Sequence, residues 1–436
     1  MNFFNKIKKI FFVGIGGIGV SALAKLFSAE SWKISGSDKH SSEITDELRK
    51  RGIKVYIGHK EGNLDSDTDL AIYSAAVGPE VLERKKAAEL GIKQLSYPKA
   101  LGLISKDKYT IAVSGTHGKS TTTAMLGLIL TEAGLNPTVI VGSKIKHLGW
   151  DENIRVGQSK YFVVEGCEWR AHMLELSPKI IVLTNIEKDH LDYYKTFKNL
   201  KQAFKKYVRK LPKNGLLVIN ADDKVCLEIA KSAKCKVTTY GIKNRPFPQF
   251  TLQIPGHFNV YNALAASTCA LELGVKPEII KKVLTNFKGI WRRFQKMGEY
   301  KGALIFSDYA HHPTAVKETL KAAKETYPDR RLVVVYQPHH FDRTKRLFSS
   351  FVRAFDEADF VILNEIYDVP GREIARKISS RNLVRELKKR KIKAVFTKTL
   401  WETKKTLLKN IKKDDIVLIM GAGDIYQLST SLFDKS

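Results

Sequence analysis

Residues 109–130 read YTIAVSGTHGKSTTTAMLGLIL, and the fold is organised around this stretch. The apolar run Thr110–Val113 predicts a buried strand, the glycines after it predict a tight turn, and the apolar spacing that follows predicts a helix. Backbone amides of such a turn and the helix N-terminus bind phosphate oxygens, Lys119 can reach the terminal phosphates, and Ser120 can hold Mg²⁺. The general motif has glycine where Val113 stands, so the loop is a shortened variant. The stretch predicts a site for a nucleotide triphosphate, with a purely structural turn as the alternative.

Length and composition set broad limits on the protein. The 436 residues, of which 43% are hydrophobic, suffice for about three domains. No apolar run approaches the roughly 18 to 20 residues of a membrane span, and the apolar N-terminal segment leads directly into a glycine-rich motif. We therefore expect a first strand there and no signal peptide. The cysteines lack short paired spacings, which argues against a disulfide framework and against a zinc site. We therefore expect a reducing compartment, the cytoplasm. They are Cys167, Cys226, Cys235 and Cys269.

The charge balance is strongly basic. Lys and Arg number 74 against 45 Asp and Glu, a net charge of +29. Such a balance is typical of proteins that bind nucleic acids, membrane surfaces or acidic substrates. The lysines are spread over the whole chain in helix-like segments such as Lys198–Lys210 and Lys388–Lys393, rather than gathered in one tail. We therefore expect small-molecule partners, no nucleic acid and no membrane.

A second glycine-rich motif lies near the N-terminus. Residues 10–19 read IFFVGIGGIG, with G-x-G-x-x-G spacing directly after an apolar run, and a strand predicted at Trp32–Ser37 ends at Asp38. In a dinucleotide-type fold such glycines admit a diphosphate and the acid meets a ribose hydroxyl. Another strand, Leu70–Ser74, ends at the same kind of edge. The motif alone is compatible with a nicotinamide enzyme, or with glycines that serve only packing.

Two further strands carry candidate metal ligands. Tyr161–Val164 ends at Glu165, and Ile180–Asn185 leads to His190. Carboxyl ends of neighbouring parallel strands lie at one edge, so Glu165 and His190 are expected to hold Mg²⁺ beside the nucleotide. The alternative for His190 is a histidine with a structural role in its loop. The neighbouring acids are expected to cap that loop: Asp189 and Asp192.

The C-terminal half repeats the alternation of strands and helices. Residues 254–274 predict a turn and an alanine-rich helix, with Asn259 and Asn262 as helix caps or as amides that read adenine or phosphate. Strands are predicted at residues 303–306, 331–336, 359–363 and 415–420. Because ligand groups in parallel α/β domains lie at strand ends, His311, His340 and Arg343 are candidate site residues.

Several segments, taken in order, resemble the Mur ligases across essentially the whole chain. They are GIGGIGVSALA, SGSD, SGTHGKSTTT, NIEKDHLDYY, PGHFNVYNALAA, WRRF, DYAHHPTAV, YQPHHFDRT and GAGD. The resemblance implies three α/β domains: a Rossmann-like UDP-substrate domain at 1–108, a P-loop ATPase domain at 109–290 and a Rossmann-like amino-acid domain at 291–436. It also implies an ATP- and Mg²⁺-dependent enzyme of cytoplasmic peptidoglycan precursor synthesis, a monomer or weak homodimer, that joins L-alanine to UDP-N-acetylmuramate through an acyl phosphate.

The resemblance also implies roles for individual residues. The catalytic residues are Lys119, His190 and His311. ATP is bound by Gly115, Thr116, His117, Gly118, Lys119, Ser120, Thr121, Asn262, Arg293 and Asp308. The UDP substrate is bound by Gly14, Gly16, Gly17, Ile18, Gly19, Asp38 and Ser74. The amino acid is bound by Tyr309, His311, His340 and Arg343, and the metal by Ser120, Glu165 and His190.

Two departures from the family pattern and several rival functions remain. The members that add L-alanine usually carry Arg where His340 stands, which predicts a weaker or different clamp on the amino acid's carboxylate. Residues 240–255 are also shorter than the usual insert, which predicts a trimmed central domain. The nearest rival is a recycling ligase that attaches an intact tripeptide to UDP-N-acetylmuramate. More distant rivals are a nicotinamide oxidoreductase, a nucleotide sensor and an RNA-binding protein.

Overall fold

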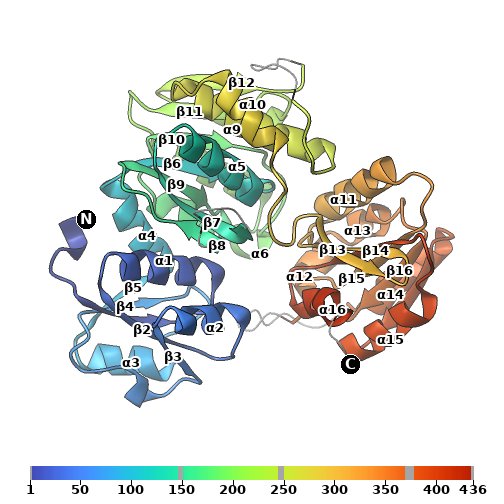
Figure 1. The fold of residues 1–436 in the computed structure, drawn as a ribbon, viewed down its shortest axis with the longest axis horizontal. Coiled ribbons are helices and arrows are strands. Elements are labelled where there is room, and N and C mark those ends of the chain that lie inside the picture. The colour runs from blue at the N-terminus through green and yellow to red at the C-terminus, as the bar shows by residue number, and fades with distance from the viewer. Residues whose placement is uncertain (1, 146–149, 151, 244–249, 369–377, 434–436) are drawn as a thin grey trace. The chain divides into compact units, whose positions relative to one another are not determined.

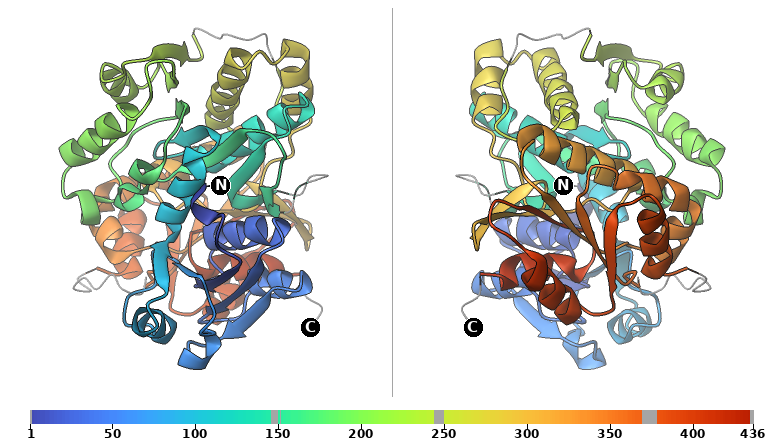
Figure 2. Two further views of the ribbon diagram at one scale, coloured as in Figure 1. Left: turned by 90° about the vertical axis from the view of Figure 1, so that its left-hand side faces the viewer. Right: turned by 90° about the vertical axis from the view of Figure 1, so that its right-hand side faces the viewer.

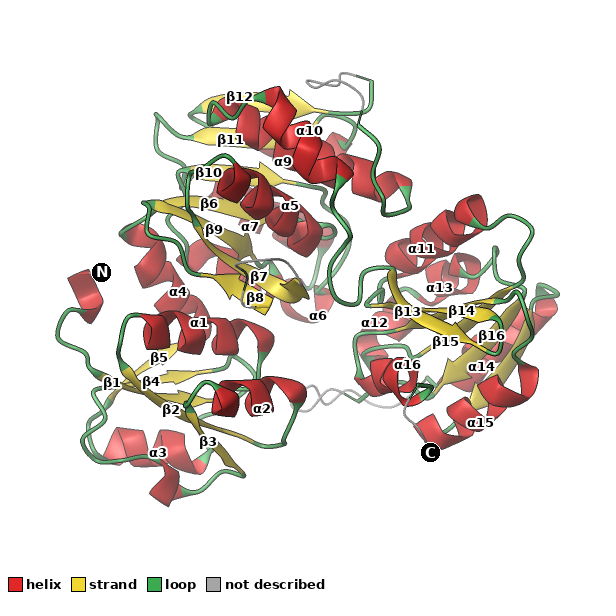
Figure 3. Cartoon of the chain, in the orientation of Figure 1, coloured by secondary structure: helices red, strands yellow, loops and turns green. Residues whose placement is uncertain are grey.

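The computed structural model describes residues 2–145, 150, 152–243, 250–368 and 378–433. Strands alternate with helices along the chain (Figure 1, Figure 3) and form three separate sheets. The chain divides into two compact units. The first unit comprises Met1–Glu187, Lys198–Gln249 and Asn262–Leu284, and the second comprises Lys188–Phe197, Phe250–Tyr261 and Thr285–Ser436.

The first sheet is entirely parallel, in the order β3-β2-β1-β4-β5. Its strands are β1 (Lys9–Val13), β2 (Lys33–Asp38), β3 (Lys54–Ile57), β4 (Leu70–Tyr73) and β5 (Lys93–Ser96). Its helical elements are η1 (Asn2–Phe4), α1 (Ile18–Ala29), α2 (Glu43–Lys50), η2 (Glu61–Asn63), α3 (Leu82–Glu89) and α4 (Tyr97–Lys106). The chain order reverses between β1 and β4, and the crevice at such a point is where doubly wound sheets bind ligands.

The second sheet has the order β12-β11-β10-β6-β9-β7-β8, and only β8 runs antiparallel to its neighbour among the paired strands described. The strands are β6 (Tyr109–Ser114), β7 (Thr138–Ile145), β8 (Glu152–Arg155), β9 (Tyr161–Gly166), β10 (Ile180–Leu183), β11 (Leu216–Asn220) and β12 (Lys236–Tyr240). The helical elements are α5 (Lys119–Glu132), η3 (Trp169–Glu175), α6 (Leu191–Tyr194), α7 (Phe197–Val208), α8 (Lys224–Ala230), α9 (His257–Glu272) and α10 (Pro277–Thr285). The central β6 leads directly into the glycine-rich loop and α5.

The third sheet has the order β13-β14-β18-β15-β16-β17, with β13 antiparallel at one edge. The strands are β13 (Gln295–Tyr300), β14 (Ala303–Asp308), β15 (Leu332–Tyr336), β16 (Phe360–Asn364), β17 (Lys393–Thr397) and β18 (Ile416–Met420). The helical elements are α11 (Pro313–Thr326), α12 (Phe341–Arg346), α13 (Phe348–Ala354), α14 (Ser380–Lys389), α15 (Leu400–Asn410), η4 (Asp424–Tyr426) and α16 (Gln427–Ser431).

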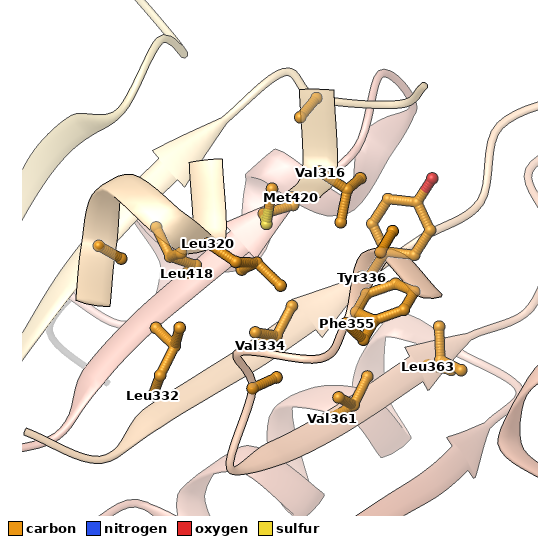
Figure 4. Packing of buried hydrophobic residues seen from close by; sticks show 14 of the residues in the cluster. Val316, Leu320, Leu332, Val334, Tyr336, Phe355, Val361, Leu363, Leu418 and Met420 are labelled. Atoms are coloured by element: carbon orange, nitrogen blue, oxygen red, sulfur yellow. The ribbon is translucent and has the colours of Figure 1, made fainter. Parts of the chain in front are cut away.

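Two hydrophobic layers cover the faces of the third sheet. On one face Val316 and Leu320 of α11 pack with Val334 of β15 and Leu418 of β18 (Figure 4). On the other face Leu407 of α15 and Leu428 of α16 pack against alternate residues of the same strands. The right-hand view of Figure 2 shows these orange and red helices around their sheet. Burial on both faces explains why the inner strands β15, β16 and β18 are continuous apolar runs.

The predicted α/β alternation is confirmed, and so are the predicted strands, within one or two residues at each end. In the described part of the chain, no helix combines the length and apolar character needed to cross a bilayer. Part of the short 240–255 stretch, residues 244–249, lies outside the described residues.

Candidate active site

The loop between β6 and α5 has a backbone that only glycine accommodates at two positions. Gly115 and Gly118 adopt φ values of 134° and 83°, in the region that L side chains rarely occupy. A Cβ at Gly115 would lie 2.2 Å from Thr184 Oγ1, and one at Gly118 would lie 2.1 Å from Asn262 Oδ1. The loop is therefore a closely fitted turn, and its amides and the start of α5 suit a phosphate group.

The residues after β10 fix the shape of this loop. The backbone N–H of His117 donates to Asn185 Oδ1 at 2.9 Å, and Thr116 N–H donates to the carbonyl of Asn185 at 2.9 Å. Thr184 Oγ1 donates to the carbonyl of His117 at 2.6 Å. Because these partners directly follow β10, the strand next to β6, the fold itself holds the loop in this conformation.

Lys119 begins α5 and turns its ammonium back into the loop. Nζ lies 2.6 Å from the carbonyl oxygen of Gly115, 3.0 Å from that of Thr116 and 2.9 Å from Oε2 of Glu168. Burial lowers the pKa of Lys119, but the Glu168 carboxylate raises it further, so the pKa stands above its usual value. The ammonium is thus held charged where the predicted phosphates would bind. Ser120 and Thr121 follow it in the first turn and are buried.

Sequence reasoning missed Glu168. It follows β9 by two residues, and only 3% of its surface is exposed. The one signal for it was a second carboxylate three positions after the candidate metal ligand Glu165, in the segment EGCE.

Asn262 lies inside α9 and not at its start, so the alternative that it caps the helix is wrong. Its Oδ1 lies 3.3 Å from Thr122 Oγ1 and against Gly118. The amide is therefore part of the wall of the phosphate loop, and its contact with adenine stays a prediction. The side-chain amide of Asn259 donates a hydrogen bond to the carbonyl of Pro255 at 2.6 Å, and this bond stabilises the turn before α9.

Glu165 lies within β9, opposite Val113 of β6. Its Oε1 accepts the backbone N–H of Gly142, on β7, at 2.5 Å. The carboxylate is thus close to the strand that leads into the phosphate loop. Glu165 belongs to the first unit and His190 to the second, so their joint binding of one metal ion stays a prediction.

The N-terminal glycine-rich turn follows β1. Gly14 N–H donates to the carbonyl of Ser37 at 2.8 Å, and Gly16 N–H donates to Asp38 Oδ2 at 2.8 Å. Ser74 lies beside this turn, since a Cβ on Gly14 would approach its Cβ to 2.9 Å. The structure therefore brings Gly14, Gly16, Asp38 and Ser74 together at the switch point of the first sheet. Gly17 precedes α1, and Ile18 and Gly19 begin it.

Gly19 has a packing role, because a Cβ there would lie 2.7 Å from the ring of Tyr97.

His59, which follows β3, was missed by sequence reasoning. Its Nδ1 lies 3.3 Å from Ser37 Oγ and 3.1 Å from Oε2 of the fully buried Glu83. His59 thus adds a ring at the same sheet edge as Asp38.

In the second unit, Arg343 and Asp189 form a buried ion pair. Arg343 Nε and Nη2 lie 3.1 Å and 3.0 Å from Asp189 Oδ1, and both side chains are less than a tenth exposed at 8% and 7%. Burial alone would raise the pKa of Asp189, but Arg343 and neighbouring histidines hold it well below its usual range. Asp189 was expected to cap its loop. It does accept the N–H of His190, but it also fixes Arg343 across 154 positions of sequence.

His340 serves the fold of this region. Its φ is +80°, its Nδ1 accepts the backbone N–H of Arg343 at 3.4 Å, and only 4% of the residue is exposed. A side chain that accepts from the third helical residue is an N-cap, so His340 stabilises the start of α12. A pocket in the second unit is lined by Lys188, Asp189, His190, Leu191, Asp192, His340, Asp342, Arg343, Arg346 and Leu347. The predicted residues His190, His340 and Arg343 therefore do meet.

The remaining candidates lie at the ends of β14 and β15. Asp308 is buried and accepts the N–H groups of Phe294 and Ala310 at 2.6 Å and 2.7 Å, while burial raises its pKa. Arg293 lies over the ring of Tyr309, 5.0 Å from its centroid. His311 Nδ1 lies 3.0 Å from the carbonyl of Tyr309, and burial and Arg343 lower its pKa well below the usual value, so its ring is neutral at pH 7.

Comparison with known proteins places these features in one family. Three family models match in order: the Mur ligase family catalytic domain at residues 9–109, the Mur ligase middle domain at 113–249 and the Mur ligase glutamate ligase domain at 292–423. The UDP-N-acetylmuramate–L-alanine ligase of Clostridium kluyveri is 41% identical over 98% of both chains. That of Alkaliphilus metalliredigens is 39% identical over 98% of this chain and 97% of its own.

Solved structures agree with the sequence matches. The crystal structure of the UDP-N-acetylmuramate–alanine ligase from Thermotoga maritima covers 98% of both chains with a TM-score of 0.83 and 28% identity. A murein peptide ligase from Psychrobacter arcticus has a TM-score of 0.75 at 23% identity, over 98% of this chain and 99% of its own, which shows the fold alone. With its three-domain α/β architecture, its glycine-rich loop between β6 and α5 and relatives that match it from end to end, the chain belongs to the Mur ligase family.

Proposed function

We propose that the protein is an ATP-dependent ligase that joins L-alanine to UDP-N-acetylmuramate. The observation that carries this proposal is the likeness to L-alanine ligases at about 40% identity over nearly the whole chain. The tripeptide-attaching alternative has weaker support, because the murein peptide ligase structure is only 23% identical. We further propose that the ranges 1–108, 109–290 and 291–436 bind the UDP substrate, ATP and the amino acid, in the cytoplasm.

The proposed reaction has two steps. The carboxylate of the muramyl group attacks the terminal phosphorus of ATP, ADP leaves and an acyl phosphate forms. The amine of L-alanine then attacks the acyl carbon, phosphate leaves and the nitrogen loses a proton to give the amide. No nucleophilic side chain is needed, so the protein acts by placing the substrates and stabilising charge. Lys119 stabilises the charge on the phosphoryl group during its transfer, and Ser120 holds Mg²⁺ beside that group. The neutral ring of His311 and the charged guanidinium of Arg343 position the amino acid.

The phosphate loop fits a nucleotide with Mg²⁺, because Ser120 and Glu165 supply the oxygen ligands that this ion prefers. When bound, Mg²⁺ neutralises phosphate charge. Glu165→Gln keeps the shape of the side chain and removes its charge, so we expect activity to fall and to recover partly at high Mg²⁺. Phosphate release measured against Mg²⁺ concentration tests this, with Glu175→Gln on η3 as the control. An unaltered Mg²⁺ dependence in both Glu165 and His190 variants would remove them from the metal site.

The N-terminal turn is proposed to bind the diphosphate of the UDP sugar. Gly16→Val would place a branched side chain within 2.9 Å of Asp38 Oδ2, in the space that the diphosphate would approach. We expect the KM for UDP-N-acetylmuramate to rise about tenfold or more, with the KM for ATP little changed. Gly62→Val is the matched control, because nothing lies within 4 Å of a Cβ there. Equal weakening of both substrates would contradict separate sites.

One assay separates the proposed reaction from its rivals. Phosphate release from ATP is measured with UDP-N-acetylmuramate alone, with L-alanine alone and with both. Release only when both are present supports ligation. Release with UDP-N-acetylmuramate and a tripeptide, but not with L-alanine, would support the recycling ligase. Oxidation of NADH or retention of RNA without phosphate release would support the more distant rivals.

A further inference from the structure

Glu168 is a buried carboxylate beside the phosphate loop that has no place among the proposed metal or substrate ligands. It lies between β9 and η3 in the first unit, and its Oε2 and Oε1 are 2.9 Å and 3.1 Å from Lys119 Nζ. Its side chain is 4% exposed and that of Lys119 is 15% exposed. A charge so enclosed is retained only beside a partner of opposite sign, and Lys119 is that partner.

The three N–H groups of the Lys119 ammonium are all engaged. A lysine ammonium has three donors and no acceptor. Here its partners are the carbonyls of Gly115 and Thr116 and the carboxylate of Glu168. A phosphate oxygen can therefore reach the ammonium only if one of these three contacts is released or shared.

The contact with Glu168 is the one that a phosphate would weaken. The loop that contains Gly115 and Thr116 is held by hydrogen bonds to Thr184 and Asn185, among them the Thr116 N–H to the Asn185 carbonyl. Glu168 carries a negative charge and so competes with phosphate for the ammonium, whereas the two carbonyls are neutral. We infer that Glu168 is a positioning residue, which holds the Lys119 ammonium in the loop and competes with the nucleotide for it. This inference rests on the proposed binding of ATP in the loop.

The inference predicts opposite effects on binding and on turnover. Because the Glu168 carboxylate binds the Lys119 ammonium, it competes with the nucleotide phosphates for that cation and limits nucleotide affinity. In Glu168→Gln the ammonium is no longer held by a carboxylate, so it is available to the phosphates and the nucleotide binds more tightly. Lys119 loses its charged partner and is oriented less well, and ADP leaves more slowly, so kcat falls. A residue with a purely structural role would weaken binding instead.

The test is calorimetric titration of the full chain with ATP and with ADP in Mg²⁺-free buffer. We expect the Kd of Glu168→Gln to be about tenfold lower than that of the unaltered protein, after screening by solvent and salt. Glu168→Asp keeps the charge and should change the Kd less than threefold. Glu132→Gln is the control, since Glu132 pairs with Lys282 at 2.6 Å near the other end of α5, and it should leave the Kd unchanged.

A second background shows whether Glu168 acts through Lys119. When Lys119 is replaced by Met, adding Glu168→Gln should lower the Kd for the nucleotide by a smaller factor, because there is no ammonium for the carboxylate to hold. Equal tightening in both backgrounds would mean that Glu168 is only a nearby charge and would overturn the inference. Unchanged or weaker binding in Glu168→Gln, or loss of activity that high Mg²⁺ restores, would also overturn it. If the unaltered protein binds no ATP, the proposed function itself fails.

Discussion

Replacing Lys119 with alanine should lower kcat/KM by about 10³-fold or more, because the loop then lacks the cation that stabilises charge on the transferring phosphoryl group. Steady-state phosphate release with UDP-N-acetylmuramate and L-alanine measures the effect. The structure adds a second consequence for this variant. Loss of the ammonium removes the cation from a buried ion pair with the Glu168 carboxylate, which destabilises the protein by about 3–5 kcal/mol.

A double variant separates the chemical effect from the effect on stability. Lys119→Ala combined with Glu168→Gln removes both charges, so urea denaturation should show most of the lost stability restored. Activity should stay low, because the catalytic cation is still missing. Near-normal turnover in a well-folded Lys119→Ala protein would remove this loop from the mechanism.

Replacing Arg343 with alanine should raise the KM for L-alanine strongly and destabilise the second unit. The guanidinium is the proposed anchor for the amino acid's carboxylate, and it also compensates the buried charge of Asp189. Removing one partner of a buried ion pair costs about 3–5 kcal/mol. Urea denaturation followed by fluorescence measures the loss, and the KM for L-alanine measures the loss of the anchor.

Arg346→Ala is the matched control. Arg346 lines the same pocket and pairs with Asp342 at 2.7 Å, but its side chain is 47% exposed, so its loss should change stability by less than about 1 kcal/mol. Asp189→Asn in the Arg343→Ala background should restore stability and not ligation. Equal stability losses in Arg343→Ala and Arg346→Ala would contradict the account of the buried pair.

The sequence predicted the inner strands of the three sheets better than their edges. β6, β15 and β18 are apolar runs because both faces of their sheets are covered, and all three were predicted. All the strands that were missed lie at or next to a sheet edge. They are β3, β5, β7, β8, β11, β12, β13 and β17. β12, with the sequence KVTTY, is largely exposed, so it lacks the apolar signal of a buried strand.

The sequence indicated candidate site residues that are close together along the chain, and it missed contacts between residues that are far apart along it. A strand, a glycine turn and a lysine are adjacent in sequence, so the phosphate loop could be recognised. Glu168 is 49 positions from Lys119, and Asp189 is 154 positions from Arg343. Only the fold brings such charges together. The role of His340 was also hidden, because an N-cap at a positive φ depends on backbone geometry that the residue type does not indicate.

The identity of the amino acid tests the central claim most directly. In the structure His340 caps α12, so Arg343 is the proposed principal anchor for the amino acid's carboxylate. One methylene more or less on a bound side chain changes binding by only about 1–3 kcal/mol, so glycine and L-serine should be weak competitors. The measurement supplies the twenty L-amino acids, D-amino acids and a tripeptide one at a time with ATP and UDP-N-acetylmuramate, and identifies each product by mass. We predict the L-alanine adduct as the main product, whereas a product formed only with a tripeptide or a D-amino acid would contradict the account.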